Sequence, residues 1–223
     1  MLHFAHRGII EYENTIQGVM EVYNEKGSDM GVEIDVRFNT ARDVVICHDR
    51  ENRNEKENAT LFQLLQSLDH ETYNGKILMI DIKAFGIKSA KELARSIVEI
   101  IKRFPNLYEN LQFYLCSFNE YCVSELLFIC EDMNMINLNI GVITTGIPLG
   151  LYNHLENIDF VSIKYDILCE EVIQNLKNKR MTIFSWVVND SSMKELMYNY
   201  NIDGLIYDVS FKPNQLNILR KSL

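Results

Sequence analysis

The sequence predicts a compact (β/α)8 barrel. Short runs rich in Val, Ile, Phe and Tyr alternate with longer runs of helical periodicity along the 223 residues. Repeated strand-then-helix order indicates a parallel sheet with helices outside, and eight such units in one chain are typical of this barrel. An open doubly wound sheet is the alternative, but no Gly-rich phosphate-binding loop follows any predicted strand.

Nine segments have the length and composition of buried strands. The predicted strands are 3–7, 32–38, 44–48, 77–83, 112–117, 140–144, 160–164, 182–188 and 204–207. The second and third would form a hairpin across the polar turn 39–43, which leaves eight strands for the barrel.

The segments between the strands repeat apolar residues at helical spacing. The predicted helices are 15–26, 61–68, 88–103, 120–133, 149–155, 168–177, 191–200 and 213–223. Asn14 is a suitable cap for the first, and Asp190 or Ser191 and Pro213 are start signals for the last two. We therefore expect one barrel domain over residues 1–223, with only a short insertion at 49–76.

Composition narrows the function classes. The chain has 31 acidic and 22 basic residues, a formal net charge of −9, which argues against a nucleic-acid partner. No apolar run approaches the roughly 20 residues of a membrane span, and no signal peptide is evident. The five cysteines are scattered without a CxxC pair, which indicates reduced thiols. We expect a cytoplasmic protein without integral membrane association.

Charged residues gather where the predicted strands end. Glu33 and Asp35 are two residues apart on one strand and must share a face, and the same holds for Asp81 and Lys83. Carboxylates together on the inner face of a barrel are costly unless a cation compensates them. Three oxygen ligands favour a hard divalent ion, Mg²⁺ or Ca²⁺, over zinc.

Two histidines also lie at strand ends. His6 and His48 suit acid–base work at neutral pH, and Arg7 and Lys83 suit phosphate binding. Together with a metal, this set describes phosphodiester cleavage better than acyl transfer, and no G-x-S-x-G elbow is present.

The order and spacing of these residues resemble the glycerophosphodiester phosphodiesterase family. The similar motifs are HRG at 6–8, ENT at 13–15, EIDV at 33–36, Thr40 and VICHD at 45–49. Weaker pieces follow as IDIK at 80–83, SF at 117–118, WVVN at 186–189 and DGLIYD at 203–208. The resemblance spans nearly the whole chain.

This resemblance implies a (β/α)8 hydrolase of lipid metabolism that releases glycerol 3-phosphate and an alcohol from glycerophosphodiesters. By motif match, the implied roles are metal ligation by Glu33, Asp35 and Asp81, acid–base catalysis by His6 and His48, and phosphate binding by Arg7 and Lys83. Glu13 would orient the site or be a helix-start carboxylate. Trp186 would line the substrate mouth or be a core residue.

Two departures from the family pattern bear on function. Asp81 stands where the family usually has Glu, and the segment 49–76 is shorter than the usual covering insertion. A less covered mouth would admit a bulkier head group, which keeps a lysophospholipase D-like lipid phosphodiesterase open as an alternative. A non-catalytic barrel that binds a phosphate-bearing ligand or a partner protein is the other alternative.

Overall fold

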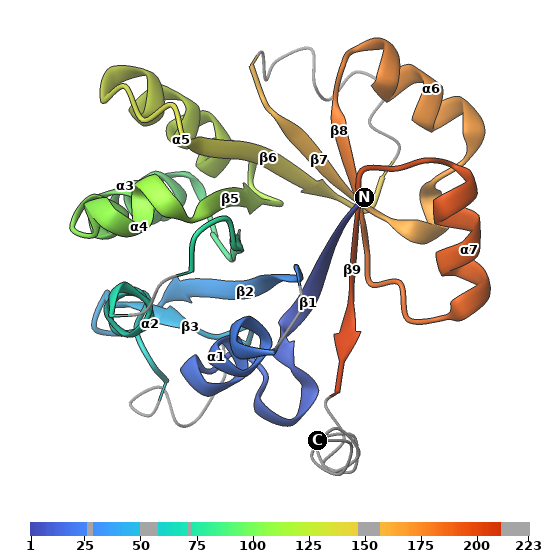
Figure 1. The fold of residues 1–223 in the computed structure, drawn as a ribbon. Coiled ribbons are helices and arrows are strands. Elements are labelled where there is room, and N and C mark those ends of the chain that lie inside the picture. The colour runs from blue at the N-terminus through green and yellow to red at the C-terminus, as the bar shows by residue number, and fades with distance from the viewer. Residues whose placement is uncertain (26–28, 50–57, 71–72, 147–156, 211–223) are drawn as a thin grey trace, which may run out of the picture.

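The computed structural model describes residues 1–25, 29–49, 58–70, 73–146 and 157–210, and the chain forms a parallel β-barrel surrounded by helices (Figure 1). The strands are β1 Leu2–Ile9, β2 Gly31–Phe38, β3 Val44–Ile46, β4 Ile77–Ile82, β5 Gln112–Ser117, β6 Leu138–Thr144, β7 Phe160–Lys164, β8 Thr182–Trp186 and β9 Gly204–Val209. Each lies within a few residues of its predicted segment.

Strand pairing closes the barrel. The order around it is β1-β9-β8-β7-β6-β5-β4-β2, and β1 also pairs with β2, so every strand of this set has two parallel neighbours. β3 pairs antiparallel with β2 and forms the predicted hairpin outside the ring. The (β/α)8 prediction is confirmed, and an open doubly wound sheet is excluded by the β1–β2 pairing.

Helices follow most of the strands. The α-helices are α1 Ile16–Asn24, α2 Leu61–Asp69, α3 Ile87–Lys102, α4 Pro105–Asn110, α5 Glu120–Asp132, α6 Glu170–Asn178 and α7 Ser191–Asn199, and the short 3-10 helices are η1 Ile10–Tyr12 and η3 Tyr165–Ile167. The predicted helices 149–155 and 213–223 lie outside the described residues. Within the described ranges, no helix is long and apolar enough to cross a membrane.

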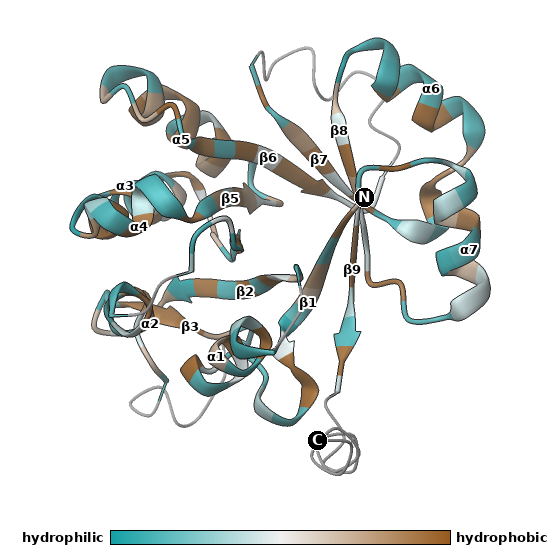
Figure 2. Ribbon diagram, in the orientation of Figure 1, coloured by the Kyte–Doolittle hydropathy of each residue, from teal (hydrophilic) through white to brown (hydrophobic). Residues whose placement is uncertain are grey.

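Two apolar layers hold the strands in place. Val32, Ile34 and Val36 point outward from β2 and pack under the helices, whose hydropathy is two-sided (Figure 2). A separate inner cluster fills the barrel, with Phe4, Phe160 and Phe184 among its fully buried members. Alternation along each strand therefore separates the helix-facing layer from the inner face that carries the charged residues.

The start of α1 differs from the prediction. Thr15, not Asn14, is the N-cap, because its hydroxyl accepts a hydrogen bond from the backbone N–H of Gly18 at 3.0 Å. Asn14 is left-handed, with φ 53°, and its side chain faces β2 instead. The prediction that Asn14 caps this helix is wrong, and its actual contacts belong to the candidate site.

Candidate functional site

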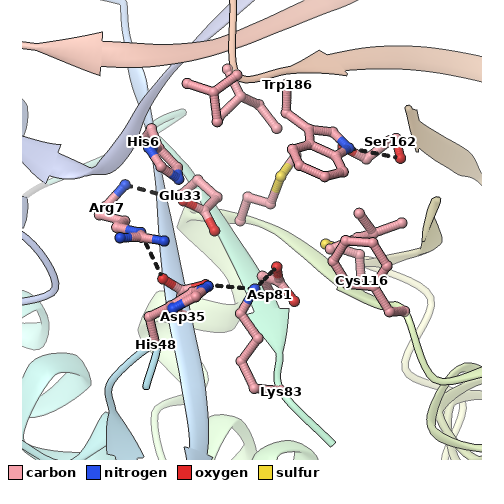
Figure 3. Close-up of a pocket in the computed structure, with 15 residues that line it drawn as sticks. His6, Arg7, Glu33, Asp35, His48, Asp81, Lys83, Cys116, Ser162 and Trp186 are labelled. Atoms are coloured by element: carbon pink, nitrogen blue, oxygen red, sulfur yellow. Dashed lines mark hydrogen bonds and ion pairs between the residues drawn. The ribbon is translucent and has the colours of Figure 1, made fainter. Parts of the chain in front are cut away.

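A cavity of about 270 Å³ opens at the carboxyl ends of the strands (Figure 3). Its walls contain every predicted site residue except Glu13. The lining residues are His6, Arg7, Glu33, Asp35, His48, Met79, Asp81, Lys83, Cys116, Phe118, Ile143, Ser162, Trp186, Val187 and Ile206. The barrel thus gathers side chains that are separated by up to two hundred residues in the sequence.

Three carboxylates form the centre of this cavity. Glu33, Asp35 and Asp81 are all buried, and one oxygen from each lies within 4.8 Å of the others. Burial and the neighbouring negative charges of Asp35 and Asp81 raise the pKa of Glu33 well above its usual value. Burial, opposed by Lys83, raises the pKa of Asp81 to about 6. A cluster of buried carboxylates is energetically costly unless positive charges lie close to it.

Two cations partly supply that charge. Lys83 Nζ lies 2.9 Å from Asp35 Oδ1 and 2.5 Å from Asp81 Oδ2, and Arg7 Nε lies 3.0 Å from Asp35 Oδ2. Burial acts to raise the pKa of Asp35, but Lys83, the Asn14 amide and Arg7 outweigh it and lower that pKa. Burial likewise opposes the charge of Lys83, yet the two aspartates raise its pKa.

The cluster fits a divalent cation. The three carboxyl groups outnumber the two positively charged side chains of Arg7 and Lys83, and Arg7 is shared with Glu13. Asp81 Oδ1 is buried and has no hydrogen-bond partner among the described residues. A buried carboxylate oxygen without a donor is suited to a hard metal ion, which needs oxygen ligands. Glu33, Asp35 and Asp81 are the residues that would hold it.

A short network orients His6. Its Nδ1 lies 2.7 Å from Asp208 Oδ1 on β9, and Asn189 Nδ2 donates to the other oxygen of Asp208 at 2.6 Å. The backbone N–H of Asp208 donates in return to Asn189 Oδ1 at 2.9 Å. The carboxylate therefore fixes the imidazole and leaves Nε2 for the cavity. Neither Asp208 nor Asn189 was predicted as a site residue, although both stand in the weaker family-like motifs.

His48 lies just after β3 and is more exposed than His6. Its Nδ1 lies 2.8 Å from Asp49 Oδ1, and the side chains of His48 and Asp49 are 42% and 79% exposed. The His48 imidazole lowers the pKa of Asp49 by hydrogen bonding to it. In both histidines, Nδ1 is therefore within hydrogen-bonding distance of an aspartate oxygen, and both side chains line the same cavity.

The turn after β1 links the first two motifs to the site. Arg7 has a left-handed backbone, φ 59°, and its N–H donates to Glu33 Oε2 at 3.1 Å. Arg7 Nη1 lies 3.3 Å from Glu13 Oε2, so Glu13 contacts Arg7 from outside the cavity wall. The carboxylates of Asp35 and Glu13 raise the pKa of Arg7, although burial opposes this. Glu13 thus has a structural partner within the site.

Asn14, which was predicted as a helix cap, is a residue of the candidate site. Its Nδ2 donates to Asp35 Oδ2 at 2.8 Å, and its Oδ1 accepts from the backbone N–H of Asp35 at 2.9 Å. These two bonds fix the rotamer of the carboxylate that also contacts Arg7 and Lys83. Only its place in the ENT motif marked it in the sequence.

The opposite wall of the cavity is apolar. Trp186 ends β8, is half-buried, and donates from Nε1 to the carbonyl of Ser162 at 3.2 Å. Phe118, which was not predicted, meets Trp186 edge-on with ring centroids 5.6 Å apart. The cavity therefore joins a charged face to an aromatic one, which suits a ligand with an anionic centre and a less polar arm.

The chain is thus a (β/α)8 barrel in which carboxylates, histidines and cationic side chains line a cavity at the carboxyl ends of the strands. No family model matches the chain, and a search of curated proteins finds no match. Solved structures do match. A glycerophosphodiester phosphodiesterase from Parabacteroides distasonis is 19% identical over 99% of this chain and 97% of its own, with a TM-score of 0.78.

Two other solved structures also match the fold of this chain. A phosphodiesterase from Oleispira antarctica, solved with sn-glycerol-3-phosphate, is 18% identical over 93% of each chain, with a TM-score of 0.77. A glycerophosphodiester phosphodiesterase from Thermotoga maritima is 23% identical over 100% of this chain and 98% of its own, with a TM-score of 0.66. The chain has the fold of these enzymes, which supports the sequence resemblance at the level of the fold.

Proposed function

We propose that this protein hydrolyses glycerophosphodiesters to glycerol 3-phosphate and an alcohol. The supporting observation is that His6 and His48 line one cavity with three clustered carboxylates and two cationic side chains. Solved phosphodiesterases of this substrate class share the fold. A purely structural cluster does not need two histidines that face the same cavity.

Glu33, Asp35 and Asp81 are the proposed ligands of a Mg²⁺ or Ca²⁺ ion. When bound, such an ion polarises a phosphoryl oxygen and offsets the negative charge of the carboxylates toward an anionic substrate. Arg7 and Lys83 are placed beside these ligands and would contact the phosphate. Glu13 contacts the Arg7 guanidinium, and Trp186 would line the substrate mouth.

His6 and His48 are the proposed acid–base pair. One imidazole accepts the proton of the glycerol 2-hydroxyl as that oxygen bonds to phosphorus. The other gives its proton to the leaving alkoxide as the phosphorus–oxygen bond breaks. Water then opens the cyclic phosphate with the roles of the histidines reversed, and direct attack by water is the other route. Asp208 and Asp49 would stabilise each imidazolium as it forms.

The test is a panel of glycerophosphodiesters and lysophospholipids, with purified protein, with and without Mg²⁺ or Ca²⁺. We expect hydrolysis of glycerophosphodiesters that a chelator abolishes and added ion restores. His6→Ala and His48→Ala should each lose at least about a hundredfold in rate. His70→Ala is the matched control, because His70 is exposed and does not line the cavity.

Four outcomes would contradict the proposal. Full activity in excess chelator would exclude metal dependence. Full activity of either cavity variant would exclude the acid–base assignment. Hydrolysis of lysophospholipids alone would favour the lipid phosphodiesterase alternative, and binding of these ligands without turnover would favour the non-catalytic barrel.

A further inference from the structure

A second cavity, of about 390 Å³, borders the first. It lies between the β2–β3 hairpin and the start of α3, and Lys83 lines both cavities. Its other lining residues are Arg37, Phe38, Asn39, Thr40, Arg42, Phe85, Ser89 and Leu93. Three of these nine side chains are cationic, and no carboxylate is among them.

Arg37 is the one cation in this cavity whose charge has no acidic partner among the described residues. Lys83 is paired with Asp35 and Asp81, and Arg42 is paired with Glu92. Arg37 is only 8% exposed, and its buried Nη1 makes no hydrogen bond to the described part of the chain. A buried guanidinium without a carboxylate is costly, and its planar fork matches an oxyanion.

Two further features of the second cavity favour the binding of a negatively charged group. The Phe85 ring lies 5.7 Å from the Arg37 guanidinium and holds it by a cation–π contact. The sixteen-residue α3 begins there after Gly86, with no side-chain cap and no acidic residue in its first turn. Its first N–H groups and the positive end of its dipole favour an anion, and Ser89 of that turn lines the cavity.

We infer that this cavity, named here the Arg37 subsite, binds an oxyanion group, either a carboxylate or a phosphate. Arg37 shares the inward-facing side of β2 with Glu33 and Asp35, and lies about 7 Å beyond Asp35 along the strand. An anionic group on the alcohol half of a bound diester spans that distance. The ligand is therefore a second anion of the substrate or a free phosphate.

The first arm of the test distinguishes these sources and rests on the proposed function. Glycerophosphoserine and glycerophosphoethanolamine differ by one carboxylate. If the substrate supplies the anion, kcat/KM of the wild type should be about tenfold higher for the serine diester, a typical gain from a charge-assisted bond. Arg37→Gln should reduce the ratio to about twofold or less. Arg103→Gln changes an exposed cation that follows the last residue of α3 and does not line this cavity, so it should leave the ratio unchanged.

The second arm needs no turnover. Inorganic phosphate is titrated into metal-free protein, whose first cavity is dominated by carboxylates, and thermal unfolding is followed. Wild type should gain several degrees at millimolar phosphate, and Arg37→Met should gain none. The Met variant removes a buried charge and should fold, which its own melting curve checks.

The results of the two arms distinguish the possible ligands of the Arg37 subsite. A phosphate shift that depends on Arg37, with an unchanged substrate ratio, supports the subsite with a free anion as its ligand. A ratio that depends on Arg37 supports a substrate anion. If neither diester is hydrolysed, the proposed function fails and the phosphate arm alone decides the subsite. If the Arg37 variants match wild type in both arms, the inference is overturned.

Discussion

Replacing Asp208 by Asn should change the tautomer of His6. Asn189 cannot flip its amide, because its Oδ1 already accepts from the backbone N–H of residue 208. Its Nδ2 must therefore keep donating to position 208, and the new amide oxygen has to face it. The new NH2 group then faces His6 Nδ1, which becomes an acceptor and moves the ring proton to Nε2.

The size of the effect follows from burial. In a fully buried Asp–His pair the wrong tautomer lowers kcat by about 10⁴. Here the side chains of His6 and Asp208 are 18% and 33% exposed, so water screens part of the interaction. We expect a loss of about 10- to 100-fold, as for other groups that orient a functional histidine. That loss corresponds to about 1.4–2.7 kcal/mol in the activation free energy.

The assay is steady-state release of glycerol 3-phosphate at saturating metal. Wild type, Asp208→Asn, His6→Ala and the double variant complete a thermodynamic cycle. If Asp208 acts through the imidazole, Asp208→Asn should have little further effect once His6 is Ala. An equal loss in both backgrounds would refute this reasoning. Asp132→Asn, an exposed change of the same chemistry on α5, should leave the rate unchanged.

Three further predictions concern stability. Because burial raises the pKa of Asp81 to about 6, above its unfolded value, stability is lost as the pH rises from about 4 to about 6 and the loss then levels off. Metal-free Asp81→Asn should therefore gain in melting temperature relative to wild type over that pH range, and a constant difference across it would contradict this. Asn14→Ala, which loses two hydrogen bonds to Asp35, should cost about 1–3 kcal/mol in urea unfolding, and less than about 0.5 kcal/mol would refute the role. Gly141→Ala would place a Cβ 2.6 Å from the Phe160 ring and should cost about 1–3 kcal/mol by the same measurement; an unchanged midpoint would show that the ring can move.

The barrel and the centre of the site could be predicted because both follow from short-range periodicity. Alternation along a strand puts Glu33 and Asp35 on one face, and likewise Asp81 and Lys83. Parallel strands in a closed ring then place all their carboxyl ends at one mouth. The structure brings these four side chains together in the cavity as expected. The roles assigned to them remain predictions.

What the sequence did not predict depends on contacts between distant segments. Nothing local to Asp208 indicates that it contacts His6, which is 202 residues away. Asn14 was assigned as a cap because Asn and Thr are both good caps, and only the structure shows that Asn14 bonds to Asp35 instead. The helix α4 was missed because six residues are too few to display a helical period.

The barrel closes only when β1, its first strand, pairs with β9, its last strand. β1 is hydrogen-bonded to both β2 and β9, and the pair between His6 and Asp208 crosses that last seam. Glu33, Asp35 and Asp81 all come from the first half of the chain, but the contact that orients this imidazole cannot form before β9 has been synthesised and has docked. Shortened products that end before β9 would lack the carboxylate that contacts His6 Nδ1.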